Sequence, residues 1–360
     1  MIDCEIFIHG TSEHISQLFT GFIMLEAEKK IKLKFNFKPF SYNNDKLLSS
    51  VPPYNLQGLF VIVNGYKKVF YDVTDGENFI NQALEVADLY FKRSYLASAI
   101  PDDCKEKVFP LGLNYEVYPG SLNKHEFLRF FISKKNYRSS PKELIKWGLR
   151  NTSVKYNPTV KNMYSVPKTG QKPKVLFMAR TWDPNTAPAG FSDEDKRKWI
   201  GIRESINDTR ATVIRTLQKE LGNDFFGGFS ISDYSVKHYP DCLLDNNKIS
   251  KKGSYIALLR EYPICIATTG LYNSIGWKLG EYVAFSKAIV SEKLIYAVPG
   301  NFEAGKNYLE FATAEECVKQ TVTLFENVKM SEEMMCNNNQ YYKEYLSPDK
   351  LILRTLERAK

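Results

Sequence analysis

Apolar and polar positions in the first third of the chain follow the two periods expected of strands and helices. Residues 3–9 alternate and then become apolar, which predicts a buried strand, and residues 15–28 repeat apolar positions at helical spacing. Further short apolar runs predict strands over residues 31–37, 59–64, 69–73, 89–91 and 107–111, with a helix over 79–87. Strands that alternate with helices predict a parallel sheet with helices on both faces.

The same alternation restarts after a connection between residues 136 and 172 that is interrupted by Pro, Gly, Ser and Asn. Apolar runs predict strands over 175–179, 225–228, 264–267 and 288–291, and helices over 206–221, 255–259, 278–285, 314–327 and most of 334–360. A chain of 360 residues exceeds the usual size of one hydrophobic core. We therefore predict an α/β protein of two Rossmann-like domains that face each other across a cleft, over residues 1–165 and 171–338, with a closing helix over 339–360.

Charge is distributed unevenly over an otherwise ordinary globular composition, which is 43% hydrophobic and 25% charged. The net charge is +8, but residues 121–174 carry 13 Lys or Arg against two Glu, so the remainder of the chain is slightly acidic. Apolar residues interleave with these cations, which suits contact with anionic lipid headgroups; a helix with a solvated basic face is the alternative. No recognised nucleic-acid-binding motif accompanies the segment, so we do not expect a nucleic-acid partner.

The scattered cysteines indicate a reducing compartment, and the lack of long apolar runs argues against a membrane span. Six cysteines are widely scattered without a CxxC pair, so we predict no metal site. Those in or beside apolar runs are predicted to be core residues: Cys4, Cys242, Cys265 and Cys317. No run approaches the roughly 20 apolar residues of a membrane span, and Asp3 and Glu5 are untypical of a secretory signal. We expect a soluble cytoplasmic protein, with the basic segment as its one candidate contact with the inner face of a membrane.

The most informative stretch, residues 268–290, has the order glycine-bearing loop, helix, turn and strand. Its loop leads into a helix N-terminus, where unpaired backbone N–H groups and the helix dipole favour a phosphate. The residues predicted to bind a donor nucleotide there are Thr269, Gly270, Asn273, Ser274, Gly276, Trp277 and Lys278. Glu281 follows about one and a half turns beyond Gly276, from where its carboxylate can accept hydrogen bonds from a ribose. An ordinary solvated helix residue is the alternative for Glu281.

This stretch resembles the donor-binding domain of glycosyltransferases of the GT-B fold. Glu281 and the residues after it, EYVAFSKAIV, are similar to the family segment whose glutamate binds the ribose of the sugar nucleotide. Many retaining members carry another glutamate in the preceding loop, where this chain has Asn273. The resemblance implies a GT-B fold and a nucleotide diphosphate-sugar donor, and it leaves open whether the enzyme is retaining or inverting.

Other parts of the chain resemble the same enzymes. Residues 296–305 are similar to a family loop, and Tyr341, Tyr342 and Tyr345 lie in a closing helix pair that in the family crosses back onto the N-terminal domain. Residues 89–94 and 109–115 resemble bacterial group 1 glycosyltransferases of capsule and lipopolysaccharide synthesis. The resemblance implies transfer of a sugar to a glycan or lipid-linked acceptor in surface polysaccharide synthesis. It also implies no metal and no cofactor besides the donor.

Two arginines are candidates for contact with the donor diphosphate. Arg180 directly follows the predicted strand 175–179, where the family has a basic residue, and Arg210 lies near the start of the predicted helix 206–221. Fixed positive charge stabilises a departing diphosphate, which a guanidinium can bind through two N–H groups. The alternatives are a surface arginine after a strand and a cation on a solvated helix face.

The candidate catalytic residues lie in the first domain. Glu13 and His14 follow the first predicted strand, and Asp75 follows the strand over 69–73, which places all three where ligands bind in doubly wound folds. An inverting transferase requires a base for the acceptor hydroxyl, although helix capping is a competing role for the first loop. Lys92 and Arg93 follow another strand and either bind the acceptor or pair with nearby carboxylates.

Two other functions remain open. A nucleotide-sugar epimerase of the same fold would release the sugar and UDP without an acceptor. A non-catalytic sugar-nucleotide-binding protein is favoured by Asn273 in place of a glutamate. All three functions predict nucleotide binding, and only a transferase predicts transfer of the sugar to an acceptor.

Overall fold

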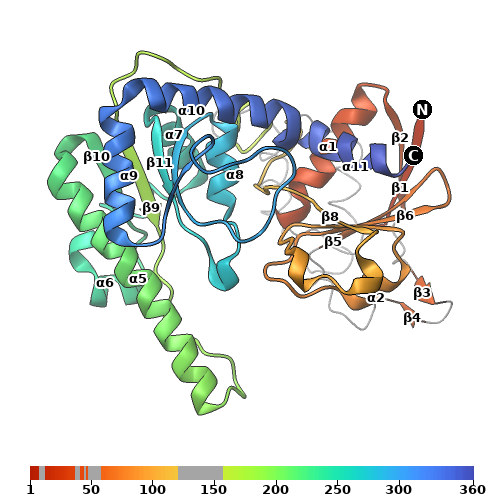
Figure 1. Ribbon diagram of the computed structural model, residues 1–360, viewed down its shortest axis with the longest axis horizontal. Coiled ribbons are helices and arrows are strands. Elements are labelled where there is room, and N and C mark those ends of the chain that lie inside the picture. Colours follow the sequence, from red (N-terminus) through yellow and green to blue (C-terminus); the bar gives the residue numbers. More distant parts are fainter. Residues whose placement is uncertain (8–12, 37–40, 44–45, 48–57, 121–156) are drawn as a thin grey trace, which may run out of the picture.

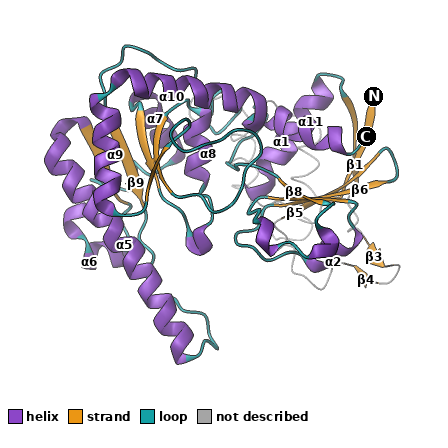
Figure 2. Ribbon diagram, in the orientation of Figure 1, coloured by secondary structure: helices purple, strands orange, loops and turns teal. Residues whose placement is uncertain are grey.

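The computed structural model describes residues 1–7, 13–36, 41–43, 46–47, 58–120 and 157–360. Within these residues the chain forms two α/β units that lie side by side, and both termini lie on the first unit (Figure 1). Helices and strands alternate through most of each unit (Figure 2). We call the unit built on β1 to β8 the first domain and the unit built on β9 to β13 the second domain.

One six-stranded sheet carries the first domain, in the order β2-β1-β5-β6-β7-β8. Its strands are β1 (Ile2–Phe7), β2 (Ile31–Asn36), β5 (Gly58–Val63), β6 (Lys67–Asp72), β7 (Leu89–Lys92) and β8 (Val108–Pro110). Alternate strand residues enter two separate core clusters because successive side chains point to opposite faces. The covering elements are α1 (Ser16–Ala27) on one face and α2 (Asn81–Val86) on the other, with a small ribbon of β3 (Ser41–Asn43) and β4 (Lys46–Leu47).

The prediction of a parallel sheet is wrong for one strand of this domain. Strand β5 runs antiparallel to both of its neighbours, β1 and β6. A tight turn joins β5 to β6, in which Asn64 and Gly65 have φ values of +53° and +80°. Asn-Gly is a typical hairpin sequence because both residues tolerate positive φ, so the signal was present in the sequence. The carboxyl ends of the other five strands still meet at one edge of the sheet.

The second sheet is parallel throughout, in the order β10-β9-β11-β12-β13. Its strands are β9 (Val175–Ala179), β10 (Phe225–Phe229), β11 (Ile264–Ala267), β12 (Ala288–Glu292) and β13 (Leu309–Phe311). Its helices are α5 (Asp193–Leu221), α6 (Asp233–His238), α7 (Lys252–Glu261), α8 (Trp277–Ala284), α9 (Ala314–Glu326) and α10 (Val328–Tyr341). The strands are apolar on both faces, as expected for a sheet covered by helices on both sides.

Helix α5 begins at Asp193, well before the predicted start at residue 206. The side chain of Ser192 caps it by accepting a hydrogen bond from the backbone N–H of Asp195 at 3.1 Å. Three acidic residues in the first turn add favourable charge near the helix N-terminus. The early turns extend away from the body of the protein as an arm (Figure 1), and their residues lack an apolar stripe that would predict a helix.

The C-terminal segment crosses from the second domain to the first. After α10, a single π-helical turn (Tyr342–Leu346) leads into α11 (Pro348–Arg358), which packs against α1. Gly21 in α1 permits this contact, because a Cβ there would overlap the backbone of Pro348. The hydroxyls of Thr355 and Tyr71 lie 2.8 Å apart and connect α11 to the first sheet.

The carboxyl edges of the two sheets face each other. Arg93, directly after β7, donates a hydrogen bond to the carbonyl of Ile275, in the loop after β11, at 2.7 Å. A β-bridge joins Tyr95 to Ala297 nearby. The predicted fold class, two Rossmann-like domains facing each other, is therefore confirmed. The four cysteines predicted in the core are buried, and no described helix is long and apolar enough to cross a membrane.

Candidate functional site

The second sheet has a topological switch point between β9 and β11. The chain moves from β9 outward to β10 on one side and then returns to β11 on the other side. Ligands of open α/β sheets bind in the crevice outside the carboxyl ends of the strands at such a point. Arg180 follows β9 at this point, and Thr269 lies in the loop that follows β11.

Arg210 of α5 bridges the loops that follow β9 and β11 at the switch point. Its Nη1 donates to the carbonyl of Arg180 at 2.8 Å and its Nη2 donates to the carbonyl of Thr269 at 3.1 Å. Burial lowers the pKa of Arg210 to about 10, while the charge of Glu292 acts in the opposite direction. Glu292 accepts hydrogen bonds from the backbone N–H and the hydroxyl of Thr269, both at 2.5 Å. Arg210 is thus a buried cation at the switch point and not a residue of a solvated helix face.

Two more cations lie beside Arg210. Arg180 is exposed, and its guanidinium carbon lies 4.2 Å from the centroid of the Trp182 ring. Lys278, in the first turn of α8, donates a hydrogen bond to the carbonyl of Met178 at the end of β9. Burial lowers the pKa of Lys278 to about 8, Glu281 opposes this shift, and Arg210 and Arg180 add to it. The crevice therefore concentrates positive charge.

The loop between β11 and α8 is folded on itself. The backbone N–H of Gly270 donates to the carbonyl of Ser274 at 2.8 Å, and that of Ser274 donates to the carbonyl of Leu271 at 3.2 Å. Tyr272 and Asn273 have φ values of +58° and +54° and are exposed. The side chain of Asn273 therefore stands at the surface of this loop, whereas Ser274 is buried.

The start of α8 offers the backbone donors of the site. Gly276 is the N-cap residue, and no side chain caps the helix. The N–H groups of Trp277 and Lys278 follow in the first turn, where helical N–H groups lack carbonyl partners within the helix. The N–H groups of Thr269 and Gly270, by contrast, already have acceptors within the protein. Residues 277 and 278 are thus better placed to bind an anion than residues 269 and 270.

Glu281 is buried and paired, which rules out a solvated helix residue. Its side chain is 4% exposed, and its Oε1 lies 2.6 Å from the Nζ of Lys252 at the start of α7. Lys252 also lies 3.3 Å from a carboxylate oxygen of Glu116, in the segment that follows β8. Glu281 stands three residues beyond Lys278, so both project from one side of α8. Its carboxylate is held in a fixed position between the crevice and α7.

A cavity of about 1010 Å³ opens beside this ion pair. Its lining comes from both domains and includes Glu13, Glu116, Asn157, Phe226, Ile249 and the first turns of α7 from Lys252. The cavity combines apolar surface with carboxylates and lysines. A volume of this size accommodates a small organic ligand such as a nucleoside.

The first domain places its candidate catalytic residues in two positions. The His14 ring centroid lies 4.7 Å from that of Trp277 at the start of α8. Asp75 pairs with Arg93 at 2.8 Å, and Arg93 also donates to the carbonyl of Ile275. Glu13 is exposed and lines the cavity beside Lys252. The fold thus brings His14 and Asp75 to the switch-point side, whereas Glu13 lies at the cavity.

Burial is the main cause of a lowered pKa at His14, and the charge of Arg93 adds to it. Asp75 and Glu13 act in the opposite direction with smaller effect. The imidazole is therefore neutral at neutral pH, the form that accepts a proton.

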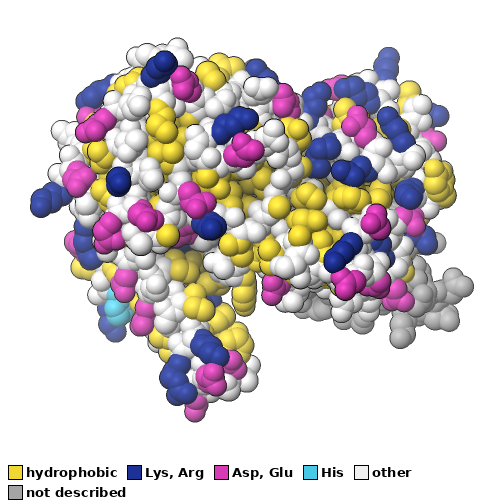
Figure 3. Space-filling model, viewed as in Figure 1, with side chains coloured by type: hydrophobic (Ala, Val, Ile, Leu, Met, Phe, Trp, Pro, Cys, Tyr) yellow, Lys and Arg dark blue, Asp and Glu magenta, His cyan; other side chains and the backbone are white. Residues whose placement is uncertain are grey.

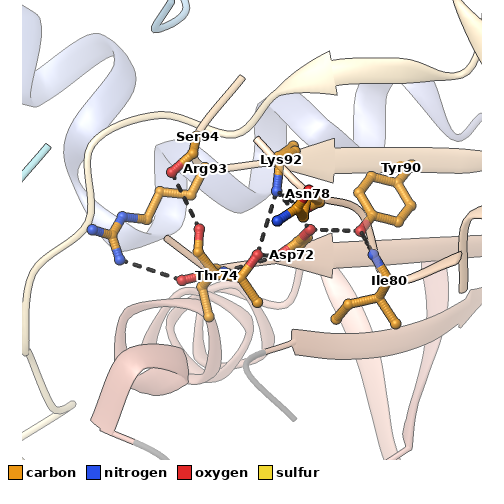
Figure 4. A network of polar contacts seen from close by, with 9 residues as sticks. Asp72, Thr74, Asn78, Ile80, Tyr90, Lys92, Arg93 and Ser94 are labelled. Carbon is orange, nitrogen blue, oxygen red and sulfur yellow. Dashed lines mark hydrogen bonds and ion pairs between the residues drawn. The ribbon is translucent and has the colours of Figure 1, made fainter. Parts of the chain in front are cut away.

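The remaining polar groups at the first edge form a closed network around Asp72 (Figure 4). Its carboxylate accepts hydrogen bonds from the hydroxyl of Tyr90 at 2.5 Å, from Lys92 at 3.0 Å, and from the N–H and hydroxyl of Thr74. Lys92 also donates to the carbonyl of Asn78 at 2.8 Å. Both charges are buried and mutually satisfied, so Lys92 pairs with a carboxylate and is not free to bind an acceptor.

Sequence reasoning missed several residues that the structure brings to this region. On α5, Arg203 and Asn207 are buried and precede Arg210 by seven and three positions, which places all three on one helix face. This spacing was readable from the sequence once the helix was known to begin at Asp193. Lys252 and Glu116 carried no local signal, because only the packing of α7 against α8 and the segment after β8 brings them to Glu281.

Most of the basic segment over residues 121–174 lies outside the described residues, so the structure does not test it. Two of its described lysines form ion pairs within the second domain, Lys172 with Asp224 and Lys174 with Glu261. Among the described residues, no group of three or more His, Cys, Asp or Glu side chains is arranged to hold a metal ion.

No protein-family model and no curated protein matches the chain. Solved structures that it resembles include a glycosyltransferase from Rickettsia africae, at 13% identity and a TM-score of 0.43, over 96% of this chain and 80% of that one. HepE from Anabaena, solved in complex with UDP and glucose, is similar over 99% of this chain and all of that one, at 10% identity and a TM-score of 0.39.

A further similar structure is the UDP-GlcNAc 2-epimerase from Neisseria meningitidis bound to UDP-GlcNAc. It matches at 12% identity and a TM-score of 0.38, over 77% of this chain and 63% of that chain.

Proposed function

We propose that this protein is a glycosyltransferase that moves a sugar from a nucleotide diphosphate-sugar to a glycan or lipid-linked acceptor in surface polysaccharide synthesis. The observation that carries the proposal is the cationic crevice at the switch point of the second sheet. Arg180, Arg210 and Lys278 surround it, and the uncapped start of α8 adds backbone donors. A diphosphate matches this arrangement in charge and in its need for N–H donors.

The neighbouring groups extend the match to a whole nucleotide. Glu281 lies beyond Lys278 on α8 with its carboxylate fixed by Lys252, within reach of the cavity that Lys252 lines. A carboxylate is a common partner for ribose hydroxyls, and the apolar part of the cavity suits a base. We therefore assign the diphosphate to the crevice, the ribose to Glu281 and the base to the cavity.

The proposed reaction uses residues of both domains. The acceptor hydroxyl oxygen forms a bond to the anomeric carbon, and the bond from that carbon to the diphosphate breaks with its electron pair. Arg180 and the start of α8 stabilise the charge that develops on the diphosphate. The hydroxyl proton passes to a base, for which neutral His14 is the first candidate; Asp75 is engaged with Arg93. We propose that neither a metal nor another cofactor takes part, so activity should persist in EDTA.

The first test measures nucleotide binding by calorimetry with UDP and GDP. We expect binding of at least one of them, and Arg180→Gln should weaken it by about tenfold, the equivalent of one charge-assisted hydrogen bond. Arg215→Gln is the matched control, because Arg215 is an exposed arginine of α5 that pairs with Asp241 outside the crevice. Failure of every nucleoside diphosphate to bind would remove the basis of the proposal.

Release of the nucleotide from sugar nucleotides then separates the candidate enzymes. A transferase should release nucleotide faster when a glycan acceptor is added, and the sugar should appear on that acceptor. Release of a free sugar with one inverted carbon, without any acceptor, would identify an epimerase. Nucleotide binding without turnover of any donor would identify a binding protein.

A further inference from the structure

An arginine–tryptophan row lies on α5 and the loop before it, next to the proposed diphosphate site. We define this row as Arg180, Trp182, Arg203 and Trp199. The guanidinium carbon of Arg203 lies 3.0 Å from the ring centroid of Trp199 and 5.9 Å from that of Trp182, and Arg180 stacks on Trp182 at 4.2 Å. The arm shows hydrophobic side chains along one side and charged ones at its tip (Figure 3).

Arg203 is buried without an anionic partner. The residue is 4% exposed, and no ion pair or hydrogen bond joins its guanidinium to any residue that the structure describes. Its Nε is buried and lacks an acceptor, as do the indole N–H groups of Trp182 and Trp199. A buried charge and buried donors without partners are costly to a folded protein. All of these groups are donors, so the missing partner is an acceptor that carries negative charge.

Uncharged neighbouring residues hold the row in place without neutralising its positive charge. Asn207, one turn after Arg203 on α5, accepts a hydrogen bond from the N–H of Trp182 at 2.9 Å and donates to its carbonyl at 2.8 Å. This double contact fixes the tryptophan against the helix. Phe191 packs edge-on against Trp199 at 5.5 Å between ring centroids and supports the other end. The geometry is therefore organised before any ligand arrives.

Arg203 lies apart from Arg210 along α5. Arg203 and Arg210 lie seven residues apart on one helix face, which corresponds to about 10 Å. Tyr272 is near enough to Arg203 to affect its pKa, belongs to the loop after β11 and lies next to Gly76 of the first domain. A group bound at Arg203 would thus lie near the first domain.

We propose that Arg203 and the two tryptophans form a subsite for an anionic group, a phosphate or a carboxylate, on the acceptor glycan. The inference rests on the proposed function and adds that the acceptor is acidic. The guanidinium pairs with the anion, while the indole rings stack on the adjoining sugar and keep the guanidinium oriented.

The test uses the full-length chain saturated with UDP, so that the diphosphate site is occupied. The probes are trigalacturonate and glucose 6-phosphate as acidic sugars, and maltotriose as the neutral match. Binding is followed by calorimetry and by tryptophan fluorescence, since the row holds two of the four tryptophans of the chain. We expect at least one acidic probe to bind about tenfold more tightly than maltotriose.

Variants of Arg203 test whether this residue binds the anionic group of the probe. Arg203→Gln should lower the affinity for the acidic probe by about tenfold or more and leave the affinity for UDP within about two-fold of its original value. Arg203→Lys keeps the positive charge but loses the planar guanidinium. Its affinity for the acidic probe should therefore lie between those of the unchanged protein and Arg203→Gln. Arg197→Gln, which removes an exposed arginine from the same arm, should change neither affinity. Melting curves of each variant verify that it folds.

Three outcomes would overturn the subsite. Equal binding of acidic and neutral probes would show that no anion is recognised, and an unchanged acidic-probe affinity in Arg203→Gln and Arg203→Lys would place the anion elsewhere. An equal loss of UDP affinity in Arg203→Gln would assign Arg203 to the donor phosphates. If no nucleotide binds but an acidic sugar binds through Arg203, the subsite stands and the proposed transferase fails.

Discussion

The facing edges of the two sheets both bury cations, but they neutralise them differently. At the first edge, Lys92 is surrounded by the carboxylate of Asp72, the hydroxyl of Thr74 and the carbonyl of Asn78. At the second edge, within the part of the chain that the structure describes, no hydrogen bond or ion pair joins Arg203 to another residue, and Lys278 donates to a backbone carbonyl. A complete polar network stabilises a loop, whereas an incomplete one indicates where a ligand completes it.

The difference also appears in the pKa values at the second edge. Burial lowers the pKa of Lys278 to about 8, with neighbouring Arg210 and Arg180 lowering it further. Burial likewise lowers the pKa of Arg203. These shifts mean that the folded protein holds positive charge against an unfavourable environment there. Binding of an anion would offset that cost. At the first edge, the carboxylate of Asp72 already neutralises the buried cation.

The largest expected effect comes from breaking the first edge. Lys92→Met leaves Asp72 buried without its cation, and we expect the free energy of unfolding in urea to fall by about 3–5 kcal/mol. Lys105→Met, which removes an exposed lysine paired with exposed Asp102, should change it by less than about 0.5 kcal/mol. An equally small change in the free energy of unfolding of Lys92→Met would mean that the Lys92–Asp72 pair does not stabilise this edge of the sheet.

A smaller effect is expected when pH titrates the second edge. Lys278 is mostly protonated at pH 7 and mostly neutral at pH 9, because its folded pKa is about 8. A diphosphate binds the protonated form better, so UDP affinity should fall by up to about tenfold over this range. Lys278→Met should bind UDP more weakly at pH 7 and lose this pH dependence. If the UDP affinity of Lys278→Met depended on pH in the same way, Lys278 would not be the group that causes this dependence.

The smallest effect, and one of opposite sign, is expected from Arg203→Met. The substitution removes a buried charge without a partner and keeps most of the side-chain volume, so the free energy of unfolding should stay constant or rise by about 1 kcal/mol. Arg197→Met on the exposed face of the arm serves as the control and should lie within about 0.5 kcal/mol. Destabilisation as large as that of Lys92→Met would show that Arg203 holds the fold, and the contrast between the two edges would disappear.

The sequence predicted the elements whose residues are apolar at regular spacing. The second sheet was readable from its buried strands, for example β9 and β12, because a strand covered on both faces needs a continuous apolar run. The first half of α5 was missed, because an exposed arm needs no apolar stripe. The antiparallel β5 was also missed, although Asn64-Gly65 carried the hairpin signal.

Part of the candidate site was equally readable. Arg180 and the residues from Gly276 to Glu281 follow a strand or begin a helix, so their place at the carboxyl edge of the sheet follows from topology. The residues that these side chains contact could not be predicted from the topology. The ion pair of Glu281 with Lys252 joins two helices, and Arg93 joins the two domains through Ile275.

Local periodicity and strand order were enough to predict the two α/β domains and the switch-point loop with Arg180 and Glu281 beside it. Which charges are neutralised depends on tertiary contacts. Lys92 and Arg203 both directly follow an apolar residue in the sequence, and only folding buries one against Asp72 and leaves the other between two tryptophans. Neutralisation depends on contacts between residues distant in the chain, and that is why the charge left for a ligand became visible only in three dimensions.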